Sequence, residues 1–201
     1  MLRELRIGGF GGQGVILSAH ILGKAAALYD GGYATMTQNY GPEARGGAAS
    51  AALIVSDEPI LYPYLTNPDI LVVMSQEAYA RFTPDVKEGG ILLVEEDLVR
   101  LDNLPQHLKV YGIPATRLAE KLGKKMVLNV VMVGFLCAIS QVISLESCRK
   151  SVNDSVPARF RELNLAAFDE GYAYGKKLLE SGPVTEETNG GDGKEELESV
   201  D

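Results

Sequence analysis

Tryptophan is absent from this sequence of 201 residues, and cysteine and histidine occur only twice each. Cys137 and Cys148 have no closely spaced partner, whereas an iron–sulfur cluster normally takes four thiolates. This chain alone therefore cannot hold such a cluster, and two unpaired thiols fit a reducing, cytoplasmic compartment. Neither histidine has a catalytic setting, because we expect His20 to be packed in the core and His107 to be solvated in a polar turn.

Positive charge is also scarce. The formal net charge is −8, and residues 182–201 alone carry −6, which leaves −2 for residues 1–181. A nucleic-acid-binding protein would need a basic face, so we expect no nucleic-acid partner. The last 20 residues are acidic and nearly free of apolar side chains, which is typical of disorder. We therefore expect one α/β domain over residues 1–181 and a disordered acidic tail over residues 182–201.

A long hydrophobic run occurs once. Residues 126–143 are uncharged over 18 positions, which is the lower limit for crossing a bilayer. The run contains polar residues and has no second run to pair with, so we expect a buried core helix and no membrane association. We also expect no signal peptide, because the N-terminus leads at once into a glycine-rich turn. Asn129, near the start of this helix, is expected to hydrogen-bond backbone groups close to that turn, with contact to a ligand as the open alternative.

Short apolar runs alternate with helical segments along the chain. We expect strands at residues 5–8, 33–40, 48–57, 69–75, 91–97 and 108–114. We expect helices at residues 15–29, from 76 onward, and at 115–123, 126–143, 145–152 and 157–179. The helix over 15–29 is apolar almost all round, which predicts that it is covered on more than one side. The alternation predicts an α/β fold with a mostly parallel sheet, a Rossmann-like start and a helical C-terminal part.

The stretch "IGGFGGQGV", residues 7–15, joins the first strand to the first helix. Gly9, Gly11 and Gly14 have the G-x-G-x-x-G spacing of a dinucleotide-binding turn. Glycine lets the backbone approach a pyrophosphate closely, and the N–H groups at the helix N-terminus favour an anion there. A nicotinamide site also needs an acidic residue at the end of the second strand, where this sequence has Thr37, Gln38 and Asn39.

Three interpretations of the glycine turn therefore remain open. It could bind a nucleotide in a free-standing Rossmann-like oxidoreductase, although the missing acidic residue weakens that reading. Its glycines could serve only the close packing of helix against strand, which is the role of one glycine in true cofactor sites. It could also belong to a site that is completed by other chains.

Three motifs in fixed order, "GFGGQGV", "TQNYGPEARGG" and "VSDEPILYP", resemble the gamma subunit of 2-oxoacid:ferredoxin oxidoreductases. The resemblance runs from about residue 6 to about residue 160. The "YGPEARGG" loop is closer to the 2-oxoglutarate branch than to the pyruvate or branched-chain branches, where a bulkier "GPERRG" loop is expected. The resemblance implies a three-layer αβα sandwich that works as an accessory subunit.

The family to which the motifs point carries out CoA-dependent oxidative decarboxylation of a 2-oxoacid to an acyl-CoA, with electrons passing to ferredoxin. The resemblance implies alpha and beta partner subunits, with a delta subunit left open. Thiamine diphosphate, Mg and iron–sulfur clusters then belong to the complex, and this chain alone holds no cofactor and is inactive. A subunit without its partners exposes apolar surface, so we expect the isolated chain to form a homodimer.

The second glycine-rich loop, residues 39–47, contains Glu43 and Arg45. Arg45 is a planar bidentate donor suited to carboxylate or phosphate, and Glu43 could hold it in place. The loop either meets CoA or a catalytic subunit, or contains an internal surface ion pair. No catalytic residue and no metal ligand is expected on this chain. The candidate contacts to CoA or to a partner subunit are Gly9, Gly11, Gly12, Gln13, Gly14, Asn39, Glu43 and Arg45. A purely structural assembly subunit remains the alternative.

Overall fold

The computed structural model describes residues 1–41, 47–101 and 106–183. Their strands form one six-stranded sheet in the order β2-β3-β1-β4-β5-β6. The strands are β1 (Leu2–Phe10), β2 (Tyr33–Tyr40), β3 (Ala48–Ser56), β4 (Ile70–Val73), β5 (Ile91–Glu95) and β6 (Lys109–Ile113). The pairs β1–β4, β4–β5 and β5–β6 are parallel. Strand β3 is antiparallel to both of its neighbours, β1 and β2.

The reversed strand has a simple cause. A parallel neighbour needs a crossover of a dozen or more residues, and the connection between β2 and β3 spans only residues 41–47. The other five strands point the same way, so the expected mostly parallel sheet is confirmed. Strand β1 is longer than expected because its first residues pair with the end of β3, from Leu2 opposite Ser56 onward.

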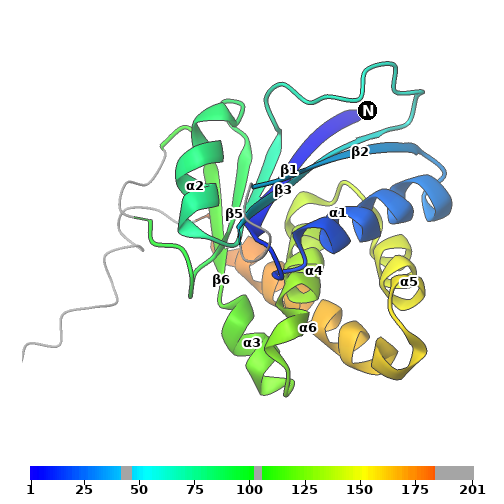
Figure 1. Ribbon diagram of the computed structural model, residues 1–201, viewed down its shortest axis with the longest axis vertical. Coiled ribbons are helices and arrows are strands. Elements are labelled where there is room, and N and C mark those ends of the chain that lie inside the picture. Colours follow the sequence, from blue (N-terminus) through cyan, green and yellow to red (C-terminus); the bar gives the residue numbers. More distant parts are fainter. Residues whose placement is uncertain (42–46, 102–105, 184–201) are drawn as a thin grey trace, which may run out of the picture.

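The helices cover the sheet unequally (Figure 1). They are α1 (Val15–Lys24), which continues as the π-helical turn η1 (Ala25–Tyr29), α2 (Gln76–Phe82), α3 (Ala115–Lys121), α4 (Leu128–Ser140), α5 (Leu145–Ser155) and α6 (Arg161–Ser181). Three short 3₁₀ turns are η2 (Thr83–Asp85), η3 (Lys125–Val127) and η4 (Ala158–Phe160). In the described part of the chain, α2 is the only α-helix on one face of the sheet and the other α-helices lie on the opposite face, so the third layer of the αβα sandwich is thin.

The long apolar run forms α4, and every residue from Asn129 to Ile139 is buried. The expected core helix is confirmed. It packs on α6 at a very close crossing, where a Cβ on Gly134 would overlap the carbonyl oxygen of Phe168. A Cβ on Gly171 would likewise overlap the carbonyl oxygen of Val131. In the described part of the chain, no helix combines the length and hydrophobicity needed to span a membrane.

One expectation for α1 is wrong. His20 is exposed and not packed in the core, whereas His107 is exposed as expected. The expectation that the helix is covered on more than one side is confirmed, because β3, α4 and α5 all pack against it. Its remaining side faces outward, where Leu17 and Leu28 are 37% and 66% exposed. The tail predicted from residue 182 lies almost wholly outside the described residues, so the domain division stays a prediction.

Candidate functional site at the glycine turn

The candidate site lies at the carboxyl edge of the sheet, between β1 and β4. Strand β1 leads into α1 on one face, and its parallel neighbour β4 leads into α2 on the other face. Adjacent strands whose helices leave to opposite faces open a crevice beyond their carboxyl ends, where α/β proteins place their ligands. The topology therefore points to the glycine turn independently of its sequence motif.

Gln13 ties the glycine turn to β4. Its side-chain Oε1 accepts a hydrogen bond from the backbone N–H of Phe10 at 2.6 Å. Its Nε2 donates to the carbonyl oxygen of Met74, directly after β4, at 2.8 Å. One predicted site residue thus has a clear architectural role, because its amide holds the two sides of the crevice together.

The glycines of the turn have different roles. A Cβ on Gly9 would lie 2.6 Å from Oε1 of Gln13, and a Cβ on Gly14 would lie 2.6 Å from Cγ and Nδ2 of Asn129. Gly14 therefore needs glycine for close packing, whereas a Cβ on Gly9 would displace the end of the Gln13 side chain and its hydrogen bonds. Gly12 has a positive φ of 96°, and a Cβ there would have no neighbour within 4 Å. The turn therefore combines tight packing at its base with open space at its tip.

Asn129 lies against the base of the turn. It is 3% exposed, and its Nδ2 has no hydrogen-bond partner among the described residues. Its backbone oxygen accepts a bond from the hydroxyl of Ser18 at 3.5 Å, on the first turn of α1. The expected hydrogen bonds from the amide nitrogen to the loop backbone are thus not made, although the expected neighbourhood is right. A buried donor without a partner is rare enough to need an explanation.

The N-terminus of α1 lies beside that amide. Gly14 is the N-cap of α1, with φ 75°, and no described side chain caps the helix. The first N–H groups of a helix have no partner within it, and together with the helix dipole they favour an anion. The first turn of α1 also carries no acidic side chain that would repel one. The chemistry at this end of α1 is that of a phosphate or carboxylate site.

The two glycine-rich loops meet at this edge. The backbone N–H of Gly11 donates to the carbonyl oxygen of Gly47 at 2.7 Å, and Gly41 pairs with Ala48 at 2.7 Å. The predicted residues Glu43 and Arg45 lie outside the described residues, so their contacts stay a prediction. Sequence positions about 36 residues apart are thereby brought into one site.

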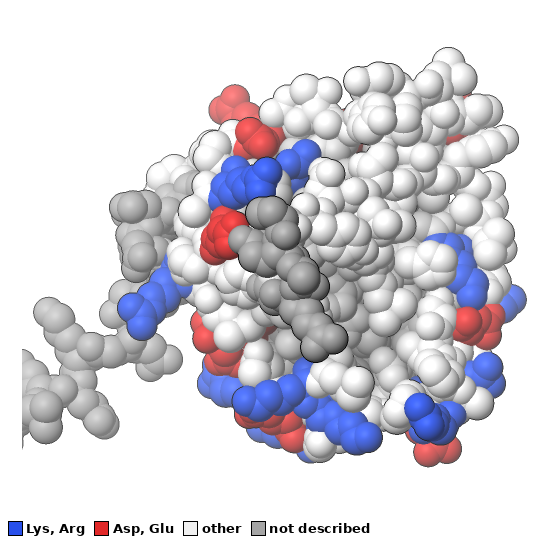
Figure 2. Space-filling view, viewed as in Figure 1, with Lys and Arg blue, Asp and Glu red and all other residues white. Residues whose placement is uncertain are grey.

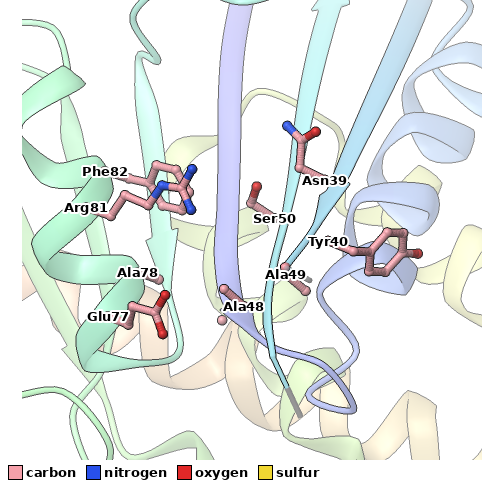
Figure 3. A pocket seen from close by; sticks show the side chains of 11 residues that line it. Asn39, Tyr40, Ala48, Ala49, Ser50, Glu77, Ala78, Arg81 and Phe82 are labelled. Carbon is pink, nitrogen blue, oxygen red and sulfur yellow. The ribbon is translucent and has the colours of Figure 1, made fainter. Parts of the chain in front are cut away.

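A pocket of about 250 Å³ opens beside the glycine turn, between α2 and the ends of β2 and β3 (Figure 3). Its walls include the predicted residues Gly9 and Asn39. The remaining lining residues are Tyr40, Gly41, Ala48, Ala49, Ser50, Glu77, Ala78, Arg81 and Phe82. Most of the sheet wall is therefore made of small side chains, and α2 supplies the charged groups, Glu77 and Arg81 (Figure 3).

Two arginines flank Phe82 at the pocket wall. The guanidinium carbons of Arg6 and Arg81 lie 4.8 Å and 5.2 Å from the ring centroid. Burial lowers the pKa of Arg6, with Asp85 acting against that shift and Arg81 adding to it. Acidic and basic side chains are interspersed on this part of the surface (Figure 2). Sequence reasoning missed Arg81 because only the tertiary structure places α2 beside the glycine turn.

The two cysteines lie away from this site. Both thiols are free and buried, Cys137 on α4 and Cys148 on α5. A hydrogen bond with Cys137, together with burial, raises the pKa of the Cys148 thiol. A thiol held in its neutral form is a poor nucleophile and a poor metal ligand, so the buried Cys148 side chain acts in packing.

With this geometry in view, comparison with known proteins assigns the family. Residues 4–174 match the pyruvate ferredoxin/flavodoxin oxidoreductase family, and the chain belongs to it. The chain is 50% identical over 180 residues to the 2-oxoglutarate synthase subunit KorC of Methanocaldococcus jannaschii, covering 89% of this chain and 96% of the relative.

Two solved structures share the fold. The gamma subunit of a keto/oxoacid ferredoxin oxidoreductase from Geobacter sulfurreducens matches with a TM-score of 0.79 and 39% identity, over 89% of this chain and 98% of that one. A 2-oxoglutarate:ferredoxin oxidoreductase from Magnetococcus marinus matches with a TM-score of 0.78 and 25% identity, over 88% of this chain and 31% of that longer chain. The chain is thus a gamma-type accessory subunit of a 2-oxoacid:ferredoxin oxidoreductase.

Proposed function

We propose that the chain serves a 2-oxoglutarate:ferredoxin oxidoreductase, which converts the 2-oxoacid with CoA to an acyl-CoA and passes electrons to ferredoxin. The relative with 50% identity bears the name 2-oxoglutarate synthase subunit. The Magnetococcus marinus enzyme was solved with 2-oxoglutarate, coenzyme A and succinyl-CoA bound. Both support 2-oxoglutarate over pyruvate or a branched-chain oxoacid as the substrate.

In this proposal the chain works with alpha and beta subunits, and with a delta subunit where the complex has one. Thiamine diphosphate, Mg and the iron–sulfur clusters are held by those partners, and ferredoxin is reached through the complex. The isolated chain is inactive and self-associates, and the complex operates in the cytoplasm, where Cys137 and Cys148 stay reduced.

The proposed role of this chain in the reaction is to bind CoA phosphate at the glycine turn. The observation that carries it is the buried Asn129 amide, whose Nδ2 has no partner in the described part of the chain and lies at the base of the turn. The uncapped N-terminus of α1 adds backbone donors, and Gly12 leaves open space for an oxygen. CoA supplies the thiol that accepts the acyl group, and this chain's residues hold and orient its charged end.

Replacing the amide by a hydrocarbon of similar size tests this role in the assembled enzyme. Asn129→Leu removes an orphaned donor, so the fold is expected to be retained. The KM for CoA should rise roughly 10–100-fold because one hydrogen bond to a charged group is lost, while the KM for the 2-oxoacid stays unchanged. Asn164→Leu is the matched control, because that buried amide already donates to Phe160 at 2.8 Å on α6. An unchanged KM for CoA in Asn129→Leu would overturn the phosphate role.

The assembly subunit alternative makes a different prediction. If the glycine loops serve only assembly, Gly12→Ala or Arg45→Ala weakens complex formation and leaves the affinity for CoA unchanged. Co-purification tests the family role itself: the tagged chain should bring alpha and beta subunits and 2-oxoacid-dependent viologen reduction. A chain that stays alone and inactive with those partners present would refute that role. Micromolar binding of NADH, NADPH or FAD to the isolated chain, measured by calorimetry, would favour a free-standing nucleotide-binding oxidoreductase.

A further inference from the structure

Strand β2 is an open edge of the sheet. Among the described residues it pairs only with β3, which leaves the backbone groups on its outer side without a strand partner. Its sequence, YATMTQNY, contains neither a charged residue nor proline. Natural edge strands normally carry lysine, proline or a bulge that prevents pairing with another chain. An eight-residue edge without these features is open to pairing with a strand of another chain.

The outer side of α1 continues this surface. Leu17, His20 and Leu28 are exposed along the helix. An apolar groove of about 150 Å³ runs between α1 and β2, with Gly23, Ala27, Ala34 and Met36 among its lining residues. Lys24 is the only charged side chain among the described residues that line it, and its Nζ donates to the backbone oxygen of Asp154 at 3.2 Å. The surface over β2, at the upper right of Figure 2, is almost entirely free of charged side chains.

We infer that β2 pairs antiparallel with β2 of a second copy of this chain, which brings the two α1 helices together on one face of a continuous sheet. A copy fits the charge pattern, because an uncharged edge meets an uncharged edge and no ionised group is desolvated without a partner. Small residues on the groove, such as Gly23 and Ala27, allow the second helix to approach closely. The inference rests on the self-association in the proposed function and names its interface, but it is independent of the proposed CoA role and of the substrate of the complex.

The contact is large enough for a specific but weak dimer. An eight-residue strand is about 27 Å long, and the strand and helix layers together are about 15–20 Å thick. The two copies would therefore bury on the order of 1,000 Å² in total, which is the lower limit for a specific interface. We expect dissociation in the micromolar range, so dimers form in concentrated samples and separate on dilution.

The alternation of side chains limits the register. Ala34 and Met36 pack on the α1 side, so Thr35 and Thr37 point to the other face. If both α1 helices lie on one face of the joined sheet, residues that are directly opposite each other in the two β2 strands have their side chains on the same face. When the two-fold axis passes near the middle of the strand, two such registers are possible. In one, Thr37 of the first copy lies opposite Thr37 of the second copy, and in the other it lies opposite Thr35 of the second copy. A charge introduced at Thr37 thus meets its own counterpart directly or on the diagonal.

Charge variants at Thr37 test this arrangement with the full chain in sedimentation velocity at several concentrations. Thr37→Lys and Thr37→Glu should each raise the dimer dissociation constant at least about tenfold, since like charges oppose each other. An equimolar mixture should restore dimers. Thr66→Lys is the matched control, because Thr66 is exposed in the loop after β3, and it should leave dimerisation unchanged. Restoration in the mixture excludes misfolding as the cause.

Hydrogen exchange gives a second readout. Amide protection over residues 33–40 should increase with protein concentration in the unmodified chain and should not increase in Thr37→Lys. A chain that is monomeric at every concentration would overturn the inference. So would a dimer that Thr37→Lys leaves intact, because its interface must then lie elsewhere.

Discussion

Gly14 and Asn129 are in direct contact, although 114 residues separate them in the chain. A Cβ on Gly14 would lie 2.6 Å from Cγ and Nδ2 of Asn129, and 2.8 Å from its Cβ. The contact joins the N-terminus of α1 to the first turn of α4. The glycine that closes the sequence motif is therefore required for packing as well as for its positive φ.

This contact predicts different responses at two glycines of the same turn. Gly14→Ala should destabilise the chain by about 2–4 kcal/mol, because backbone strain adds to a clash in the core. Gly12→Ala introduces the same kind of backbone strain, but its Cβ would have no neighbour within 4 Å. We therefore expect a smaller loss in the free energy of unfolding, of about 1–2 kcal/mol. Urea unfolding of the two variants measures the difference. Equal losses of stability in the two variants would show that Asn129 moves aside without cost and that the contact does not require glycine.

The α4–α6 crossing should be the least tolerant place in the fold. Gly134→Ala and Gly171→Ala each put a methyl group into the backbone of the facing helix, so we expect losses above about 4 kcal/mol or insoluble protein. Gly175→Ala is a graded control, because its Cβ would meet the side chain of Ala138 at 2.7 Å and no backbone atom closer than 3.3 Å. It should cost less in the same unfolding measurement. A soluble Gly134→Ala variant of unchanged stability would contradict this packing.

Asp30 should contribute stability that is lost in acid. Its carboxylate accepts bonds from the hydroxyls of Ser144 and Ser147, both at 2.6 Å, and from the backbone N–H of Ser144 at 2.7 Å. Partial burial raises the pKa of Asp30, but these hydrogen bonds outweigh it and hold the pKa below 3.8. The stabilisation is therefore full above that ordinary value and is lost as the pH falls through the lowered pKa.

The variant Asp30→Asn checks this linkage. At pH 7 it should unfold about 1 kcal/mol more easily, and the difference from the unmodified chain should shrink below about pH 4. Asp169→Asn is a suitable control, because that carboxylate pairs with Arg149 on the exposed surface at 2.9 Å. Parallel pH profiles for Asp30→Asn and the unmodified chain would argue against the role of Asp30.

Glu95 should behave in the opposite way. It is fully buried at the end of β5, where Oε1 accepts from the backbone N–H of Thr116 at 3.0 Å and Oε2 has no partner among the described residues. Burial raises the pKa of Glu95 above 4.5, with Asp97 adding to the shift and the Thr116 bond opposing it. The folded state is thus favoured below pH 4.5 and loses stability as the pH rises through the raised pKa.

Glu95→Gln keeps the acceptor and removes the buried charge. Its stability relative to the unmodified chain should increase between pH 5 and pH 8 by up to about 1–2 kcal/mol, measured by urea unfolding at each pH. Glu96→Gln is the control, because that exposed carboxylate pairs with Arg117 at 3.0 Å and should show little pH dependence. A variant that is less stable at pH 8 than at pH 5, relative to the unmodified chain, would refute a buried Glu95 carboxylate.

Much of the fold could be predicted from local patterns. The apolar run that forms α4, the strand–glycine–helix start and the order of the elements follow from hydrophobic period and turn chemistry. The exposure of His20 could not be predicted, because it depends on which side of α1 the sheet and the other helices cover. Arg81 was missed for the same reason, since it joins the site only through the neighbouring positions of β1 and β4.

The sequence by itself determined the element types, the close backbone approach at the glycine turn and the family, because these depend on residue order and short-range sterics. Only the tertiary structure decided three features of the described residues: Nδ2 of Asn129 has no hydrogen-bond partner beside Gly14, α2 completes the pocket, and β2 is an open edge. Strand order, helix placement and the exposed side of α1 arise from contacts between segments far apart in the chain. Such contacts are settled by the packing of the whole core, which no local pattern encodes.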